Sequence, residues 1–266
     1  MEYQIYSLLG HFFYLIIFLF GLCLGSFVNS WVWRHHENIR ISRGRSICPS
    51  CRRKLKWYEN VPVLGYVFLK GKCLTCKREI PKHFIFVELI TPILLVFVTW
   101  YHLDIAAEFN SSLYHRDVFF IGILLVIFIY DYLYKIILSE LVYLGIAIGI
   151  FFNFSLIYAT PLQMLYGALA AGGFFYLQYV VSKGKWIGGG DVRLGVLMGV
   201  WLGWPNVLVA VMFAYITGAL VGLSLLLSKK KKMNSEIAFG TFLSLGTFVA
   251  LLNAREIISW YLALLR

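Results

Sequence analysis

Charged side chains are scarce in this sequence. Only 13 of its 266 residues are Asp or Glu, against 24 Lys and Arg, and charged residues make up 14% of the chain. A soluble domain has about 25% charged and 45–50% apolar residues, whereas 60% of this chain is hydrophobic and its mean hydropathy is +0.77. Such a chain would expose far too much apolar surface in water. The composition therefore excludes an ordinary soluble protein and indicates one that lies in a bilayer.

The beginning of the chain lacks the features of a secretory signal peptide. The first ten residues contain no Lys or Arg, and no small-residue cleavage site follows the first apolar stretch. A signal peptide has both a basic start and such a cleavage site. We therefore expect the stretch from about Phe12 to Trp33 to be a retained transmembrane helix.

The formal net charge of +11 does not indicate a nucleic-acid partner. Most of this charge falls in two segments that flank apolar stretches, 34–82 and 229–232. Basic residues at such places normally set the orientation of a membrane protein and contact anionic lipid headgroups. No basic face interleaved with aromatic residues occurs in a soluble module. We therefore expect contact with membrane lipid and none with nucleic acid.

The apolar stretches are long enough to be transmembrane helices. A helix needs about 20 apolar residues to cross a hydrocarbon core of about 30 Å, and helices are the spanning structure that fits this pattern. The sequence predicts an all-α polytopic membrane protein with about eight transmembrane helices. These spans are approximately 11–33, 83–102, 118–134, 138–158, 162–182, 192–204, 206–228 and 237–253. The sixth is the shortest, and the tail 254–266 either extends the last helix or lies along the interface.

The distribution of Lys and Arg predicts the orientation. With the loop 34–82 placed in the cytoplasm, alternation of the spans puts all but three of the 24 Lys and Arg residues inside. The positive-inside rule favours this arrangement, with both termini outside. No internal repeat or low-complexity segment is evident. We expect a division near residue 116, into an N-terminal region of two spans with the large loop (1–116) and a six-helix bundle (117–266).

Four of the five cysteines lie in this cytoplasmic loop, as Cys48-Pro-Ser-Cys51 and Cys73-Leu-Thr-Cys76. Two C-x-x-C pairs can supply the four thiolates of a closed structural zinc site, although the gap between the pairs slightly exceeds the common ribbon spacing. A redox pair is the alternative, and a reducing cytoplasm disfavours disulfides. We therefore expect a zinc-ribbon-like loop that folds only with its metal.

Acidic residues inside transmembrane spans are rare and costly, so each one is a candidate for function. They are Glu88, Asp131, Glu140 and Asp191. The predicted topology places Asp131 and Asp191 at the same depth on the cytoplasmic side. Gly188, Gly189 and Gly190 precede Asp191, and glycines let the backbone bend and approach a neighbour closely.

Two carboxylates in one site suggest aspartyl protease chemistry. Because two close like charges cannot both ionise cheaply, such a pair shares one proton. The ionised member activates water as a general base, and the protonated member polarises the scissile carbonyl. Either aspartate could instead be an interfacial residue or a helix cap. The other function classes are a transporter that relays protons or ions, which would favour midplane acids and repeated halves, and a membrane scaffold.

Short motifs follow one another in order along nearly the whole chain. They are GSFVN at 25–29, RSICPSC at 45–51, WYENVP at 57–62, GKC at 71–73, VEL at 87–89 and GGGDVRL at 188–194. In these motifs the chain resembles the type IV prepilin peptidases, which are GxGD-type intramembrane aspartyl proteases. The resemblance implies that Asp131 and Asp191 are the catalytic pair, and that Gly188, Gly189 and Gly190 form the active-site loop.

The resemblance also implies substrates, a second activity and a location. The substrates would be prepilins or pseudopilins of type IV pilus or protein secretion systems, cut after a glycine at the end of a basic leader. The new N-terminal residue would then be methylated with S-adenosylmethionine. The location would be the bacterial cytoplasmic (inner) membrane. A peptidase-only GxGD protease with another substrate is the nearest alternative.

The methyltransferase activity would belong to the N-terminal region with its four-cysteine loop. No glycine-rich βαβ fingerprint of soluble methyltransferases occurs in the sequence. The residues that the resemblance implies as contacts to the donor or the substrate are Trp57, Tyr58, Asn60, Gly71 and Glu88. Glu88 could equally pair with a lysine of the loop such as Lys82.

One departure from the family pattern follows the first aspartate. Family members usually have Pro-Asp or Pro-Asn there, and this chain has Leu138-Ser139, followed by Glu140. We expect the loop to be less rigid without the proline. Glu140 is either a spare carboxylate or an ordinary interfacial residue. Because both aspartates are present, we expect activity to be retained.

Overall fold

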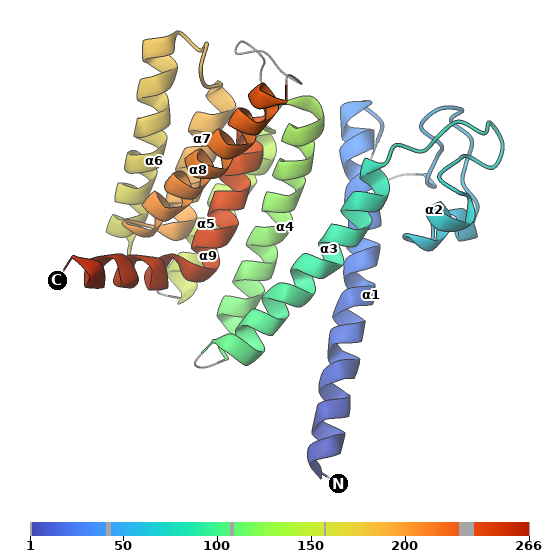
Figure 1. The fold of residues 1–266 in the computed structure, drawn as a ribbon, viewed down its shortest axis with the longest axis horizontal. Coiled ribbons are helices and arrows are strands. Elements are labelled where there is room, and N and C mark those ends of the chain that lie inside the picture. Colours follow the sequence, from blue (N-terminus) through green and yellow to red (C-terminus); the bar gives the residue numbers. More distant parts are fainter. Residues whose placement is uncertain (1, 41–43, 107–108, 157, 229–236, 266) are drawn as a thin grey trace. The chain divides into compact units, whose positions relative to one another are not determined.

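The computed structural model describes the chain except for residues 1, 41–43, 107–108, 157, 229–236 and 266 (Figure 1). Every regular element among the described residues is a helix, and two isolated β-bridges lie in the loop after the first helix. The prediction of an all-helical membrane protein with a four-cysteine loop in this place is confirmed. The chain folds as two compact units, residues 1–114 and 115–266.

The first unit consists of two long helices and a loop with short helical turns. Its elements are α1 (Glu2–His36), the 3₁₀ turn η1 (Trp57–Asn60), α2 (Leu64–Phe68), α3 (His83–Trp100) and the π-helical turn η2 (Tyr101–Ile105). The two long helices pack against each other. The loop between them brings the four cysteines together.

Two glycines of α1 allow its close contact with α3. A Cβ on Gly21 would collide with Pro92, and a Cβ on Gly25 would lie 2.9 Å from the Cα of Glu88. Small residues four apart on a transmembrane helix let the two backbones approach in this way. The spacing Gly21-x-x-x-Gly25 therefore positions the first turns of α3, which include Glu88.

The second unit is a helical bundle (Figure 1). Its helices are α4 (Ser111–Tyr134, which begins just before the boundary), α5 (Ser139–Leu156), α6 (Pro161–Ser182), α7 (Gly189–Leu202), α8 (Asn206–Leu227) and α9 (Phe239–Leu264). Seven helices of the described part of the chain are long and apolar enough to cross a membrane. The predicted sixth span is α7, whose 14 residues correspond to about 21 Å, less than the hydrocarbon core of about 30 Å.

Protein surrounds the short helix α7. It packs against α5, α6, α8 and α9, and Leu194, Leu197, Met198 and Trp201 on it are fully buried. A helix that is apolar and buried around its circumference belongs to the core of a bundle. This explains why α7 need not be long enough to face lipid along a whole span.

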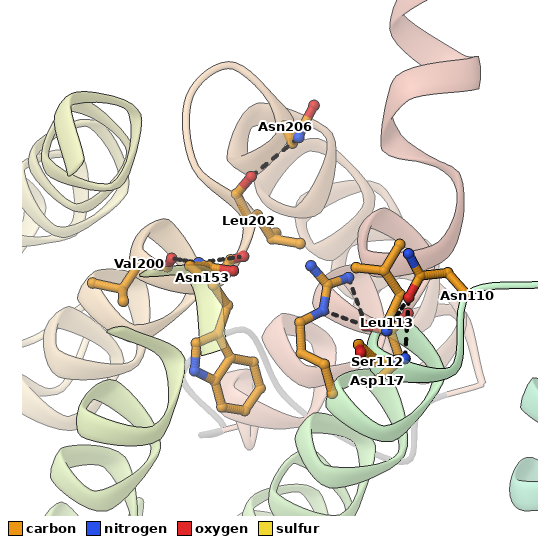
Figure 2. Close-up of polar contacts among 10 residues, drawn as sticks. Asn110, Ser112, Leu113, Asp117, Asn153, Val200, Leu202 and Asn206 are labelled. Atoms are coloured by element: carbon orange, nitrogen blue, oxygen red, sulfur yellow. Dashed lines mark hydrogen bonds and ion pairs between the residues drawn. The ribbon is translucent and has the colours of Figure 1, made fainter. Parts of the chain in front are cut away.

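Side chains from neighbouring segments satisfy the carbonyl groups at the end of α7. The last carbonyls of a helix have no partner within it. The amide nitrogen of Asn153 donates to the carbonyl oxygen of Val200 (2.7 Å), and that of Asn206 donates to Leu202 (3.1 Å), as Figure 2 shows. The indole of Trp201 donates to the carbonyl of Gly145 (2.8 Å). These bonds fix the end of α7 within the bundle.

Two of the three basic residues that the predicted topology places on the outer side of the membrane contact one tyrosine. The guanidinium of Arg116 lies 3.8 Å from the ring centroid of Tyr158, and that of Arg255 lies 4.6 Å from it. Arg116 and Asp117 form a buried ion pair (2.6 Å). The run 229–232, on which the predicted orientation partly depends, lies outside the described residues. The orientation itself stays a prediction.

The tail from Ala254 onward extends the last helix. The helix α9 continues to Leu264, and Figure 1 shows its C-terminal part turned away from the direction in which the helix begins. Trp260 and Tyr261 in this part are 63% and 56% exposed. Aromatic residues of this kind favour the membrane–water interface.

The crossing of α6 and α7 gives a first prediction. The backbones of Gly167 and Gly199 touch there, so a Cβ on Gly199 would collide with Gly167 and Ala168. We expect Gly199→Ala to force the helices apart and destabilise the protein by about 1–3 kcal/mol, the usual cost of overpacking. The measurement is the thermal unfolding midpoint in detergent.

Gly173→Ala on α6 is the matched control. Nothing lies within 4 Å of a Cβ at Gly173, and alanine has a helix propensity better than glycine by up to about 1 kcal/mol. The control should therefore unfold at the same or a higher temperature. Equal midpoints for the two variants would contradict the close crossing.

Candidate active site and metal centre

The two aspartates lie in the second unit, at the ends of different helices. Asp131 belongs to the last turn of α4 and is 4% exposed, and Asp191 belongs to the first turn of α7 and is 8% exposed. Their carboxyl groups are close enough to interact electrostatically. The structure therefore brings together the two acids that the sequence singles out, within the apolar bundle.

The carboxyl group of Asp131 lies at the N-terminus of α9. The backbone N–H of Thr241 donates to its Oδ2 (2.9 Å). A Cβ on Gly240 would lie 2.9 Å from the same oxygen. Unpaired N–H groups and the positive end of the helix dipole make a helix N-terminus a binding place for a carboxylate. Sequence reasoning missed Gly240 and Thr241, although the glycine at the start of the last span was a signal.

The carboxyl group of Asp191 caps its own helix. Its Oδ2 accepts a hydrogen bond from the backbone N–H of Gly188 (3.0 Å). Asp191 is therefore a helix cap, which was the alternative interpretation of this residue from the sequence. It also interacts with Asp131. The glycines before it serve close approach rather than unusual backbone angles, since none of Gly188, Gly189 and Gly190 has a positive φ. A Cβ on Gly190 would lie 3.0 Å from the Cβ of Ile137.

Ile137 supports the segments of both aspartates. This side chain comes from the short connection between α4 and α5, and its contact with Gly190 places it against the start of α7. A Cβ on Gly240 would lie 2.8 Å from Cδ1 of Ile137, so the same side chain also contacts the start of α9. Nothing in the sequence indicates this role, because an isoleucine at the end of a span is ordinary.

The segment Leu138-Ser139, which departs from the family pattern, is bound to α7. The guanidinium of Arg193 donates to the hydroxyl oxygen of Ser139, and its Nε donates to the carbonyl of Gly189 (3.1 Å). Ser139 begins α5, so this contact holds the connection that lacks the proline. Glu140, which follows it, is exposed. The exposure favours an interfacial residue over a spare carboxylate.

A tyrosine that sequence reasoning missed lies near Asp191. Tyr215 of α8 interacts electrostatically with Asp191, and its hydroxyl donates to Oε1 of Gln178 (2.9 Å). The ring of Phe239 packs against Tyr215, with 5.2 Å between the centroids. A signal was present, because Gln178 is a polar residue within an apolar span and such residues need partners.

In the first unit the four cysteines form one cluster. The Sγ atoms of Cys48, Cys51, Cys73 and Cys76 all lie within 4.8 Å of one another, and no disulfide joins them. Four thiolates at such separations suit a tetrahedral metal ion, for which soft sulfur ligands and Zn–S distances of about 2.3 Å are typical. The cluster could therefore hold a metal.

The cluster is built from two copies of one turn. The N–H of Cys48 donates to the carbonyl of Arg53 (2.9 Å), and the N–H of Cys73 donates to that of Arg78 (2.9 Å). Arg52 and Lys77 occupy matching positions with φ of 60° and 59°. The expectation of no internal repeat is wrong here. The signal was the repeated pattern of C-x-x-C, a basic residue and an arginine.

An ion pair joins the cluster to η1. Arg53 donates to both carboxylate oxygens of Glu59, one of them at 2.8 Å, and to Sγ of Cys73 (3.6 Å). The hydrogen bonds from Arg53 hold the pKa of the buried Glu59 carboxyl below its usual range. Both the fold of η1 and the surroundings of Cys73 therefore depend on Arg53, a residue that sequence reasoning did not select.

The five residues predicted to contact the methyl donor or substrate lie in different surroundings. Asn60 and Glu88 line a cavity beside the loop that carries the four cysteines. Trp57 and Tyr58 are 82% and 41% exposed. Gly71 is buried in a turn with φ of +68°, where a Cβ would lie 3.0 Å from the hydroxyl of Tyr66. The structure therefore groups two of the five around one cavity.

Glu88 does not pair with Lys82. No ion pair joins these two described residues. Its Oε2 accepts a hydrogen bond from the backbone N–H of Val63 (2.7 Å). Glu88 thus links α3 to the end of the loop.

Comparison with known proteins gives matches over most of the chain. The model of the bacterial Peptidase A24 N-terminal domain matches residues 19–102, and that of the type IV leader peptidase family matches residues 118–223. The prepilin leader peptidase/N-methyltransferase of Bacillus subtilis is 31% identical, over 93% of this chain and 97% of its own length. The protein of the same name from Legionella pneumophila is 27% identical, over 94% of this chain and 95% of its own.

No solved structure matched the chain. The two family models leave few residues between them, and the relatives match along nearly their whole length. The helices long enough to cross a membrane agree with this assignment. The chain therefore belongs to the type IV leader peptidase family, peptidase A24, and is a multi-pass membrane enzyme of this bacterial family.

Proposed function

We propose that this protein removes the basic leaders of type IV prepilins or pseudopilins after a glycine and N-methylates the new N-terminal residue. The observation that carries the peptidase activity is the meeting of two buried carboxyl groups, Asp131 and Asp191, in one apolar bundle. The names of the relatives support both activities, since each is called a prepilin leader peptidase/N-methyltransferase.

The hydrogen bonds of the two aspartates suit a pair that shares one proton. Asp131 accepts the backbone N–H of Thr241 at the start of α9, and Asp191 accepts that of Gly188 at the start of α7. N–H donors stabilise a carboxylate over a carboxylic acid. Either aspartate can therefore hold the negative charge while the other holds the proton.

Peptide hydrolysis follows from the sharing of one proton. The ionised aspartate takes a proton from water, and the oxygen of that water attacks the carbonyl carbon of the scissile glycine. The protonated aspartate donates a hydrogen bond to the carbonyl oxygen as it gains charge. The intermediate then collapses, the C–N bond breaks, and the proton taken from water passes to the leaving amine. Polar groups around the pair would orient the substrate, and Tyr215 is one candidate.

We infer that methyl transfer belongs to the N-terminal unit. The donor S-adenosylmethionine would supply an electrophilic methyl group, and the new N-terminal amine would accept it. The four cysteines would hold a structural zinc ion that keeps the loop folded. The distribution of Lys and Arg supports a location in the inner membrane, with the loop and both aspartates on the cytoplasmic side.

The aspartate pair gives the central prediction. Asp131→Asn and Asp191→Asn should each lower the rate of leader cleavage by at least about a hundredfold, because general acid–base groups contribute 10²–10⁴-fold. The measurement is mass spectrometry of the N-terminus of a model prepilin, incubated with purified enzyme in nanodiscs. This readout separates cleavage from methylation, since each changes the mass differently.

Glu140→Gln is the control for the loss of an acid, because Glu140 is exposed on the neighbouring helix. It should cleave at the wild-type rate. Full cleavage by both aspartate variants would refute the aspartyl mechanism. An ion or proton flux that depends on the aspartates would then favour the transporter, and no effect at all would favour the scaffold.

The metal centre gives a prediction with two readouts. The purified enzyme should contain one zinc ion per chain by elemental mass spectrometry, and Cys48→Ser should lose it. Removal of the metal by a chelator should abolish methylation while the prepilin is still cleaved, because the cysteines and the aspartates lie in different units. Cys23→Ser, outside the cluster, should retain the zinc. Active, methylating enzyme without any metal would contradict the assignment.

The contact between Arg193 and Ser139 gives a prediction about positioning. Ser139→Ala should lower kcat about tenfold with little change in KM, since a hydrogen bond to a charged group contributes about 1.5–3 kcal/mol. Ser139→Thr keeps the hydroxyl and should behave as wild type. The double variant Leu138→Pro, Ser139→Asp restores the usual family pattern and places a carboxylate beside Arg193, so it should retain kcat. A raised KM with unchanged kcat would contradict the positioning role.

A further inference from the structure

The loop between α1 and α3 contains an apolar stretch, residues 57–69, which we call the loop segment. It comprises η1, the turn that follows and α2. Its sequence is WYENVPVLGYVFL, in which Glu59 is the one charged residue. Glu59 is buried and paired with Arg53. The exposed surface of the loop segment therefore carries no charged side chain.

Large apolar side chains of the loop segment project from the protein. Trp57 is 82% and Phe68 79% exposed, the largest exposed fractions among the large hydrophobic residues that the structure describes. Leu64 and Val67 are more than half exposed, and they share one face of α2 with Phe68, since residues three and four apart on a helix are neighbours. Tyr66, by contrast, lines the cavity beside α1. An exposed apolar face of this kind marks a place of interaction with protein or lipid.

The loop segment lies beside the two transmembrane helices of the first unit. The backbone N–H of Val63, just before α2, donates to Oε2 of Glu88 (2.7 Å). At 1.5 Å per residue, Glu88 is about 8 Å along α3 from its start at His83. A Cβ on Gly25 would contact Glu88, and Gly25 is about 16 Å along α1 from its end at His36. Val63 is therefore level with the interior of both spans.

Further contacts place the loop segment at the same depth. Asn60 and Pro62 line one hollow together with Cys23 and Phe27 of α1, and Figure 1 shows α2 beside α1 rather than beyond its end. The headgroup region of a bilayer is about 5–8 Å thick on each side of the hydrocarbon core. The segment thus reaches the depth at which the acyl chains begin. A soluble partner would have to displace lipid to cover α2.

Exposed lysines flank the loop segment at both ends. Lys54 and Lys56 precede it, and Lys70 and Lys72 follow it. Neither Lys70 nor Lys72 forms an ion pair with another described residue. Lysine side chains can reach from an apolar environment to the membrane surface, where anionic phospholipids attract them. An apolar, aromatic-rich centre between basic residues is typical of an element that lies in the membrane interface.

We propose that the loop segment is inserted in the leaflet on its own side of the membrane and binds anionic phospholipid there. Leu64, Val67 and Phe68 contact the acyl chains, and the flanking lysines contact the phosphate groups. The inserted segment holds the second cysteine pair, which begins at Cys73, close to the membrane surface. This anchor is separate from the spans and from the metal centre.

The experiment is photocrosslinking of the full-length protein in nanodiscs of phosphatidylglycerol and phosphatidylcholine. The photoreactive residue p-benzoylphenylalanine replaces Phe68, and mass spectrometry identifies what it has joined. We expect an adduct with lipid. Ile93 is the positive control, because it is 54% exposed within the span of α3, and a probe there should also join lipid.

Ser50 is the negative control within the same loop. It is exposed in the first cysteine turn, in which Arg52 pairs with Glu37 just beyond the end of α1 (2.6 Å). A probe in place of Ser50 should give no lipid adduct. The thermal unfolding midpoint checks that each probe variant is folded, and a probe in place of Val67 repeats the test on the same face of α2.

Three outcomes would overturn the insertion. Adducts between α2 and another segment of the same chain would show that the protein itself covers this face. Adducts with a second copy of the chain would show an interface between copies. If the probe at Ile93 joins lipid and those at Phe68 and Val67 join nothing, the loop segment lies in water.

The lipid charge tests the part played by the lysines. With phosphatidylcholine alone, the yield of the lipid adduct at Phe68 should fall at least about twofold. The double variant Lys70→Gln, Lys72→Gln should give the same yield in both membranes. Lys77→Gln with Arg78→Gln makes the same charge change at exposed positions outside the flanks and should respond to lipid as wild type does. Equal wild-type yields in the two membranes would refute the binding of anionic lipid.

Discussion

Burial of two carboxyl groups in an apolar bundle is the constraint on which the second unit depends. A charge taken out of water is costly unless fixed dipoles or hydrogen bonds replace its hydration. Here the N-termini of α9 and α7 take that role, since Thr241 donates to Asp131 and Gly188 donates to Asp191. Both helices must therefore begin at the same place. The connections before them, and the glycines Gly190 and Gly240, are arranged to bring these starts together.

The core of the bundle keeps this arrangement rigid. The short helix α7 is enclosed by its neighbours, crosses α6 where Gly167 and Gly199 meet, and is tied at its end by Asn153 and Asn206. Close packing of this kind leaves few alternative positions for a side chain at the start of the helix. The first unit obtains its rigidity differently. There the cysteine cluster and the pair of Arg53 and Glu59 order a loop that has little apolar core.

Much of the fold and of the candidate site could be predicted from the sequence, because membrane spans and reactive side chains leave strong local signals. The order of the helices, the cysteine cluster and the meeting of Asp131 with Asp191 follow from hydropathy, spacing and the cost of a buried acid. The contacts of Ile137, Thr241 and Tyr215 could not be predicted, since they arise when distant segments pack together. The short length of α7 follows from its enclosure, which hydropathy alone does not reveal. The repeated cysteine turn and the Gly21-x-x-x-Gly25 spacing were readable but overlooked.

The position of Ile137 constrains how this protein can vary in evolution. Its side chain lies against Gly190 and Gly240, where an added Cβ would come within 3.0 Å and 2.8 Å of it. A mutation at any one of the three changes the space available to the other two. These positions should therefore covary across the family, and a bulkier residue at 190 should accompany a smaller one at 137. Selection acts on the volume that the three share, and the active site changes through compensated steps rather than single ones.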